Sequence, residues 1–288
     1  MYATFDLDIP QDLEGALEIL ASGDGPAATP LAGGTNLIVD IRAKRERPTR
    51  VVGLDKVGEL RGIECTQERI TIGSRTTVSD LLNSPEIAAA APSLVDAARV
   101  FAGHMVRNTA TVGGNIACGS PAADLVPPLM SLDAEITLTS TSGSRSVALA
   151  DYFTGYKQDV RRAGELITKI TWSRLPARSV NTFRKLGRRI GDAITVTGVA
   201  VTLVVEDGVC QRARIALGAV APVVFRATAA EAVIEGQALS ADLIDAAAKR
   251  AAAESSPIDD VRASAEYRLH TTETLTRRLL IQAWQQLG

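Results

Sequence analysis

The stretch Thr111-Val-Gly-Gly-Asn-Ile-Ala-Cys-Gly-Ser-Pro-Ala-Ala-Asp124 decides how this sequence of 288 residues folds. A β-branched pair runs into two adjacent glycines, which end a strand and let the backbone approach another group closely. Successive backbone N–H groups in such a turn, with no Cβ in the way, form a concavity that suits phosphate oxygens. The same design occurs at Leu31-Ala-Gly-Gly-Thr-Asn-Leu37. We expect these two glycine-pair segments, 31–37 and 111–115, to hold the two phosphates of one dinucleotide.

The composition is typical of a soluble globular protein with room for one large or two ordinary domains. Hydrophobic residues make up 46%, charged residues 22%, and the net charge of -2 gives no reason to expect nucleic acid as a partner. The apolar runs fall short of the roughly 20 residues that a membrane span needs. Three isolated cysteines fit a reducing compartment and have no metal-ligand spacing, so we expect a cytoplasmic protein without a metal site.

Short strands alternate with helices in the first half of the sequence. Hydrophobic periodicity predicts strands at 5–7, 29–32, 51–54, within 60–73, at 135–140 and 165–172, and helices at 12–21, 78–82, 85–102 and 125–132. The β-α-β beginning places the first glycine-pair segment after a strand. Its spacing is not Gly-x-Gly-x-x-Gly, which counts against a Rossmann fingerprint.

The second half predicts a separate small domain. A proline interrupts two strand patterns near 174–178, where we place a boundary. Strands are predicted at 182–186, 193–205 and 211–220, and helices at 227–234, 241–253 and 265–287. Glu206-Asp-Gly208 is a good hairpin signal between the last two strands. The expected fold class is α+β, with an antiparallel sheet followed by helices in the second domain.

Five motifs in order resemble the FAD-binding medium subunit of the molybdenum hydroxylases, the family of carbon monoxide dehydrogenase, xanthine dehydrogenase, quinoline oxidoreductase and nicotine dehydrogenase. They are Ala32-Gly-Gly-Thr-Asn36, Arg107-Asn-Thr-Ala-Thr-Val-Gly-Gly-Asn-Ile-Ala with Ser120-Pro-Ala-Ala-Asp124, Phe183-Arg-Lys-Leu-Gly-Arg-Arg-Ile-Gly-Asp192, Arg214-Ile-Ala-Leu-Gly-Ala-Val-Ala-Pro222, and Glu266-Tyr-Arg. The resemblance implies a PCMH-type FAD-binding domain at 1–175, with subdomains at about 1–56 and 57–175, and a C-terminal flavoprotein domain at 178–288.

The resemblance also implies the cofactor and the partners. This chain would carry FAD, while an iron–sulfur small subunit with 2Fe-2S clusters and a molybdopterin large subunit would complete a heterotrimer, usually doubled. The flavin would collect electrons from the 2Fe-2S subunit and pass them to an external acceptor, and this chain would not touch the organic substrate.

The resemblance also assigns individual residues. The family segment that wraps the FAD pyrophosphate and its adenosine side is matched by Leu31, Ala32, Gly33, Gly34, Thr35, Asn36 and Leu37. Thr111, Gly113, Gly114 and Asn115 match the second pyrophosphate loop, where the threonine and asparagine side chains add donors. Asp124 matches a carboxylate that binds ribose or polyol hydroxyls, and it could cap the following helix, alone or in addition to that role. Phe101 matches an aromatic residue near the adenine, and Ile167 matches an apolar residue that lies against FAD. Lys185 or its neighbour Arg184 matches a basic residue near the flavin. No catalytic residue is assigned.

Two other functions remain open at this point. One is a self-contained PCMH-type FAD oxidoreductase that acts directly on a small molecule, which would need a general acid or base facing the flavin. The other is a nucleotide-binding regulatory module that never changes its redox state.

Overall fold

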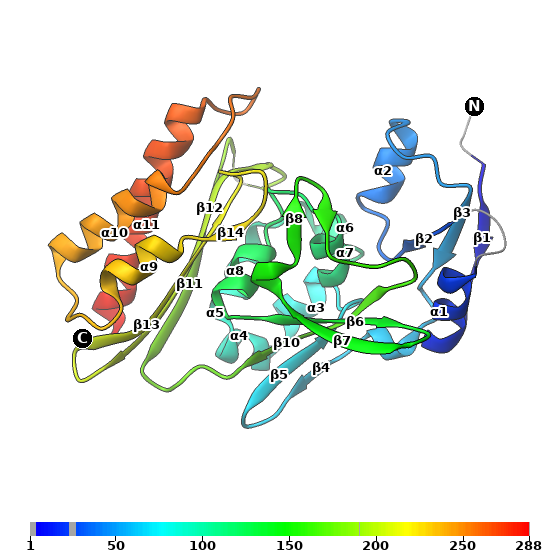
Figure 1. The fold of residues 1–288 in the computed structure, drawn as a ribbon, viewed down its shortest axis with the longest axis horizontal. Coiled ribbons are helices and arrows are strands. Elements are labelled where there is room, and N and C mark those ends of the chain that lie inside the picture. Colours follow the sequence, from blue (N-terminus) through cyan, green and yellow to red (C-terminus); the bar gives the residue numbers. More distant parts are fainter. Residues whose placement is uncertain (1–3, 23–26, 190, 288) are drawn as a thin grey trace.

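The N-terminal lobe is a small parallel sheet with two helices. The computed structural model describes residues 4–22, 27–189 and 191–287. The lobe contains β1 (Asp6–Asp8), α1 (Leu13–Ala21), β2 (Ala28–Leu31), α2 (Leu37–Arg42) and β3 (Arg50–Gly53), with strand order β1-β3-β2 (Figure 1). Both strand pairs are parallel. The predicted β-α-β beginning is confirmed, and the first glycine-pair segment connects β2 to α2.

The middle of the chain is a five-stranded sheet covered by short helices, with strand order β4-β5-β10-β6-β7 (Figure 1). Its strands are β4 (Ile63–Cys65), β5 (Arg69–Gly73), β6 (Glu135–Ser140), β7 (Gly143–Ala148) and β10 (Leu166–Ser173). Its helices are η1 (Gly58–Leu60), α3 (Val78–Asn83), α4 (Pro85–Ala90), α5 (Pro92–Val100), α6 (His104–Arg107), α7 (Val112–Ala117), α8 (Val126–Ser131) and η2 (Leu149–Asp151). A separate two-stranded ribbon joins β8 (Phe153–Gly155) to β9 (Gln158–Asp159).

Prolines decide where the helices of this region begin and end. The single helix predicted over 85–102 is wrong, because Pro92 has no N–H to donate and starts a new helix, α5, after α4. In α8 the two prolines follow directly on Val126, in the first turn, where no intrahelical N–H is needed. The helix predicted over 125–132 therefore forms despite them.

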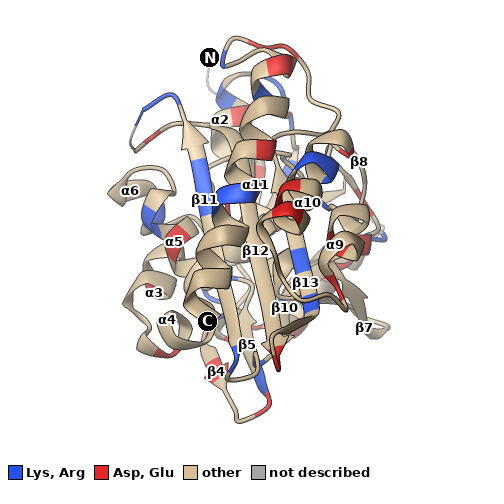
Figure 2. Cartoon of the chain, turned by 90° about the vertical axis from the view of Figure 1, so that its left-hand side faces the viewer, with Lys and Arg blue, Asp and Glu red and all other residues tan. Residues whose placement is uncertain are grey.

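The C-terminal domain is an antiparallel sheet with helices on its outer face (Figures 1 and 2). It contains β11 (Ser179–Gly187), β12 (Thr195–Glu206), β13 (Val209–Gly218), β14 (Phe225–Arg226), α9 (Thr228–Ile234), α10 (Ala241–Ala253) and α11 (Ala265–Leu287). Asp207 and Gly208 both have positive φ, which forms the predicted tight hairpin between β12 and β13. No helix within the described ranges is long and apolar enough to cross a membrane.

The C-terminal sheet is buried on both faces, which fixes the two domains against each other. Val199, Val201 and Leu203 pack with α9, α10 and α11. Phe183 and Ala200 belong instead to the core of the middle domain. The burial of all positions from 195 to 205 of β12 follows from this sandwich.

Asn181 forms a polar link inside this interface. Its Oδ1 accepts from the backbone N–H of Ser93 at 3.1 Å, and its Nδ2 donates to Thr202 Oγ1 at 2.6 Å and to Ser131 Oγ at 3.3 Å. These partners belong to α5, β12 and α8, and the Asn181 side chain is buried. One amide therefore joins the C-terminal sheet to two helices of the middle domain.

The variant Asn181→Ala is expected to lower the free energy of unfolding by about 1–3 kcal/mol, because the buried N–H of Ser93 loses its acceptor and the Thr202 and Ser131 hydroxyls each lose one of their partners. Urea denaturation followed by circular dichroism measures the change. The exposed Asn83 serves as the matched control, and Asn83→Ala should stay within about 0.5 kcal/mol of the parent. Equal stabilities of the two variants would contradict the role given to Asn181.

Candidate functional site

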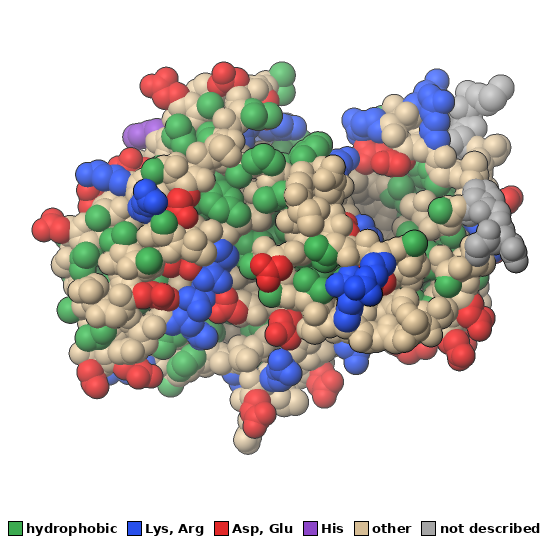
Figure 3. Space-filling model, viewed as in Figure 1, with side chains coloured by type: hydrophobic (Ala, Val, Ile, Leu, Met, Phe, Trp, Pro, Cys, Tyr) green, Lys and Arg blue, Asp and Glu red, His purple; other side chains and the backbone are tan. Residues whose placement is uncertain are grey.

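A large cavity opens between the N-terminal lobe, the middle domain and the end of the C-terminal sheet. Its volume is about 1130 Å³. Figure 3 shows the surface hollowed beside the lobe that carries α2. Every site residue predicted from the sequence lines this cavity, namely Leu31, Ala32, Gly33, Gly34, Thr35, Asn36, Leu37, Phe101, Thr111, Gly113, Gly114, Asn115, Asp124, Ile167 and Lys185. The structure thus brings all of them together, and their contacts with a ligand stay predictions.

The first glycine-pair segment touches the chain just before the second one. A Cβ on Gly33 would lie 1.8 Å from the carbonyl oxygen of Thr109, so only glycine allows this backbone approach. Gly34 has φ of 69°, a conformation that L side chains rarely adopt. After this turn, the N–H of Ile38 donates to the carbonyl of Gly34 at 3.0 Å, and α2 begins. Gly33 thus brings the first segment against the chain at Thr109, and Gly34 lets the chain turn into α2.

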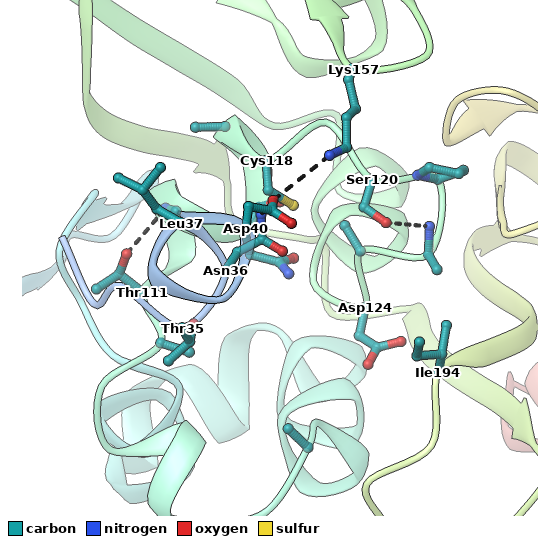
Figure 4. Close-up of a pocket in the computed structure, with 18 of the residues that line it drawn as sticks. Thr35, Asn36, Leu37, Asp40, Thr111, Cys118, Ser120, Asp124, Lys157 and Ile194 are labelled. Carbon is teal, nitrogen blue, oxygen red and sulfur yellow. Dashed lines mark hydrogen bonds and ion pairs between the residues drawn. The ribbon is translucent and has the colours of Figure 1, made fainter. Parts of the chain in front are cut away.

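The second glycine-pair segment is a short helix, α7, and not the predicted strand end with an open turn. The Thr111 side chain accepts from the N–H of Gly114 at 3.1 Å and caps the helix (Figure 4). The N–H groups of Val112 and Gly113 donate to the carbonyls of Thr76 and Ser74 at 3.0 and 2.8 Å. The predicted concavity of successive free N–H groups is therefore wrong for this segment.

Two side chains of this segment can act as hydrogen-bond donors where its backbone N–H groups are already used. The Asn115 Oδ1 accepts from the N–H of Leu125 at 3.1 Å, and Asn115 lines the cavity, so its Nδ2 can still act as a donor. The Thr111 hydroxyl can donate its proton while its oxygen caps the helix. Gly113 is required for packing, since a Cβ there would lie 2.6 Å from the Cβ of Ser74.

Asp124 forms a buried ion pair that links the middle domain to the C-terminal sheet. Its Oδ2 lies 2.6 Å from Lys185 Nζ, and its Oδ1 accepts from the Thr195 hydroxyl. It does not cap α8, whose N-cap is Leu125 without a side-chain bond. Burial raises the pKa of Asp124, and the adjacent Lys185 and Thr195 offset part of that rise. The pair thus presents one ammonium and one carboxylate to the same wall of the cavity.

The C-terminal domain contributes wall residues that the sequence analysis did not assign. Arg268 is buried and donates to the carbonyls of Val196 and Ala219 at 2.8 and 2.7 Å, and to Asp260 at 2.8 Å. Partial burial raises the pKa of Asp260, but the N–H and guanidinium of Arg262, together with Arg268, outweigh that effect and lower the pKa to about 2. Glu266-Tyr-Arg268 was recognised as a motif, but nothing in its spacing indicated a cavity wall.

The remaining predicted residues form apolar walls. Ile167 is buried on β10, and Phe101 is half-buried at the end of α5. Tyr156 and Ile194, which were not predicted, are 61% and 55% exposed and line the same cavity. One part of the cavity is therefore polar, around the glycine-pair segments, and other parts carry apolar side chains.

Two family models match the chain. The FAD binding domain in molybdopterin dehydrogenase covers residues 3–176, and the CO dehydrogenase flavoprotein C-terminal domain covers residues 181–283.

Several proteins are similar over nearly the whole chain. The carbon monoxide dehydrogenase medium chain of Afipia carboxidovorans is 34% identical over 280 residues, 97% of this chain and 96% of that protein. The 6-hydroxypseudooxynicotine dehydrogenase complex subunit alpha of Paenarthrobacter nicotinovorans is 32% identical over 97% of this chain and 94% of that protein. Among solved structures, the carbon monoxide dehydrogenase of Hydrogenophaga pseudoflava has a TM-score of 0.95 at 31% identity, with both chains fully covered. Quinoline 2-oxidoreductase of Pseudomonas putida has a TM-score of 0.91 at 28% identity, with 100% of this chain and 99% of that chain covered.

The Asp260 carboxylate predicts a pH-dependent stability. Because its folded-state pKa of about 2 lies below the ordinary value of 3.8, the ionised group stabilises the fold above pH 4 and loses that effect as the pH falls toward 2. Asp260→Asn should therefore cost about 1–2 kcal/mol of unfolding free energy at pH 7 and about half of that at pH 3. Chemical denaturation of both proteins at several pH values measures this difference. If the difference in unfolding free energy between the parent and Asp260→Asn stayed constant from pH 7 to 3, the lowered pKa of Asp260 would be refuted.

Proposed function

The chain belongs to the family of FAD-binding medium subunits of molybdenum hydroxylases, and from this premise we propose that it is the electron-transfer subunit of such a complex. It is an oxidoreductase subunit with FAD as its cofactor. We infer that it takes electrons from an iron–sulfur subunit with 2Fe-2S clusters and passes them to an external acceptor. The observation that carries the proposal is that two glycine-pair segments, far apart in sequence, line one cavity.

The cavity fits FAD in size and in the character of its walls. Its volume of about 1130 Å³ lies at the upper end of the roughly 300–1000 Å³ of small-molecule and cofactor pockets, which leaves room for an extended dinucleotide. The glycines let the two segments meet around the diphosphate, and Thr111 and Asn115 can donate to its oxygens. Bound FAD supplies a carrier that accepts two electrons and releases them again.

The residues of this chain hold and orient the cofactor. Residues 31–37 and 111–115 bind the pyrophosphate, and Phe101 lies against the adenine side. Asp124 accepts from ribose or polyol hydroxyls with lone pairs that Lys185 and Thr195 leave unused. Ile167 excludes water from the cofactor. The Lys185 ammonium would attract negative charge on the flavin, and its ion pair with Asp124 at 2.6 Å would reduce that attraction.

The partners follow from the same premise. We propose that the chain assembles with an iron–sulfur small subunit and a molybdopterin large subunit, as a dimer of heterotrimers. The similar proteins are known as the medium chain of carbon monoxide dehydrogenase and as subunit alpha of a dehydrogenase complex, which supports this assembly. We place the complex in the cytoplasm, because Cys65, Cys118 and Cys210 are all unpaired, as a reducing compartment requires.

Affinity purification of the tagged chain from its natural host tests the function. The expected preparation contains FAD, iron–sulfur absorption and molybdenum in stoichiometric amounts, whereas the chain expressed alone contains FAD without iron or molybdenum. The self-contained oxidoreductase predicts the opposite, namely a flavoprotein without metal from both sources that oxidises a small molecule by itself. That result would overturn the electron-transfer assignment.

Gly33→Ala tests whether the first glycine-pair segment holds FAD. The new Cβ would collide with the Thr109 carbonyl and separate the two segments, so FAD affinity should fall about tenfold or more. Gly58→Ala is the matched control, because a Cβ there has open space around it. Isothermal titration of the deflavinated proteins with FAD measures both. Parent-like affinity in Gly33→Ala would show that the cofactor is bound elsewhere.

A further inference from the structure

Lys157 differs from the other cations around the cavity. Among the described residues that line it, every other Lys and Arg has a carboxylate oxygen within 3.1 Å of its side chain, as in the pairs Arg75–Asp55, Arg161–Asp159, Lys185–Asp124, Arg262–Asp260 and Arg268–Asp260. The Nζ of Lys157 lies 3.8 Å from Asp40 Oδ2, beyond hydrogen-bond distance. Among the described Lys and Arg side chains that line the cavity, Lys157 therefore has the weakest contact with a protein carboxylate.

Asp40 does not depend on Lys157. Its Oδ1 is bound by Arg45 at 2.6 Å, and its Oδ2 accepts from the amide of Asn36 at 3.0 Å. The Asp40 side chain is 8% exposed, whereas that of Lys157 is 42% exposed. Lys157 can therefore turn away without leaving the Asp40 carboxylate buried and unpaired.

The backbone fixes where Lys157 stands. It lies between β8 and β9, at the tip of the ribbon, with φ of 54°. Its Cα packs against Gly119, where a Cβ would lie only 2.9 Å away. Gly119 follows the second glycine-pair helix, α7, after Cys118. In Figure 4 the Lys157 side chain points toward Asp40 and Cys118, between α2 and the end of α7. The ammonium thus reaches the space between the two glycine-pair segments.

We propose that Lys157 binds the anionic pyrophosphate of FAD, turning its ammonium from Asp40 to the phosphate oxygens. The proposal rests on the proposed function, since it needs FAD in this cavity. Asp40 lines the same cavity and is already paired with Arg45, so the ammonium of Lys157 adds a positive charge there that attracts the diphosphate. Lysine is a flexible point charge that suits phosphate without fixed geometry. The β8–β9 tip thereby closes over the phosphate part of the cavity.

FAD titration of the deflavinated full-length chain tests the proposal. Lys157→Gln should weaken FAD binding about tenfold at low ionic strength, and the loss should shrink as salt screens the contact. Lys157→Arg, which keeps the charge, should stay within about threefold of the parent. Lys169→Gln, on the exposed side of β10 and outside the cavity, is the matched control and should bind as the parent does.

The possible results separate this proposal from the function on which it rests. Parent-like FAD affinity of Lys157→Gln at low salt would overturn the role of Lys157 and leave the FAD site intact. Equal losses in the Gln and Arg variants, independent of salt, would also overturn it, because they would indicate a packing role. A parent chain that does not bind FAD at all would contradict the proposed function itself.

Discussion

Close contact between backbones, possible only at glycine, is the constraint on which the rest of this structure depends. Gly33 lies against the Thr109 carbonyl, and Gly113 lies against Ser74, at distances that no Cβ allows. The first contact joins the N-terminal lobe to the middle domain, and the second places α7 against the turn after β5. In the part that the structure describes, the lobe is a sheet of three short strands, and its position over the cavity rests on this contact together with the apolar packing of Leu17 and Val52 with Leu60 and Leu166. The glycine pairs therefore have a structural role, because they allow the close packing that shapes the cavity.

The C-terminal domain completes the cavity through polar contacts. Lys185 and Thr195, on β11 and β12, bind both oxygens of Asp124, and Arg268 on α11 ties the ends of β12 and β13 to Asp260. Breaking a buried ion pair is costly because one charge is left without its partner. The contacts of Asp124 with Lys185 and Thr195 cross from the middle domain to the C-terminal sheet, whereas those of Arg268 stay within the C-terminal domain.

The sequence predicted the fold class and the residues that meet in the cavity, but not how the second glycine-pair segment is built. Val112 and Thr111 favour a strand, yet the Thr111 cap and the carbonyls of Ser74 and Thr76 close a helical turn, a tertiary effect that a local pattern cannot contain. The sequence did not predict that Thr195 and Lys157 line the cavity, for a similar reason. A single threonine or lysine has no distinctive pattern, and only the packing of distant segments brings it to the site.

A crystal structure of this chain with FAD tests the central claim most directly. The account predicts the pyrophosphate between segments 31–37 and 111–115, a ribose or ribityl hydroxyl within hydrogen-bond distance of Asp124, and the flavin ring on the side of Lys185. Electron density for FAD on another surface, or a diphosphate away from both glycine-pair segments, would contradict it.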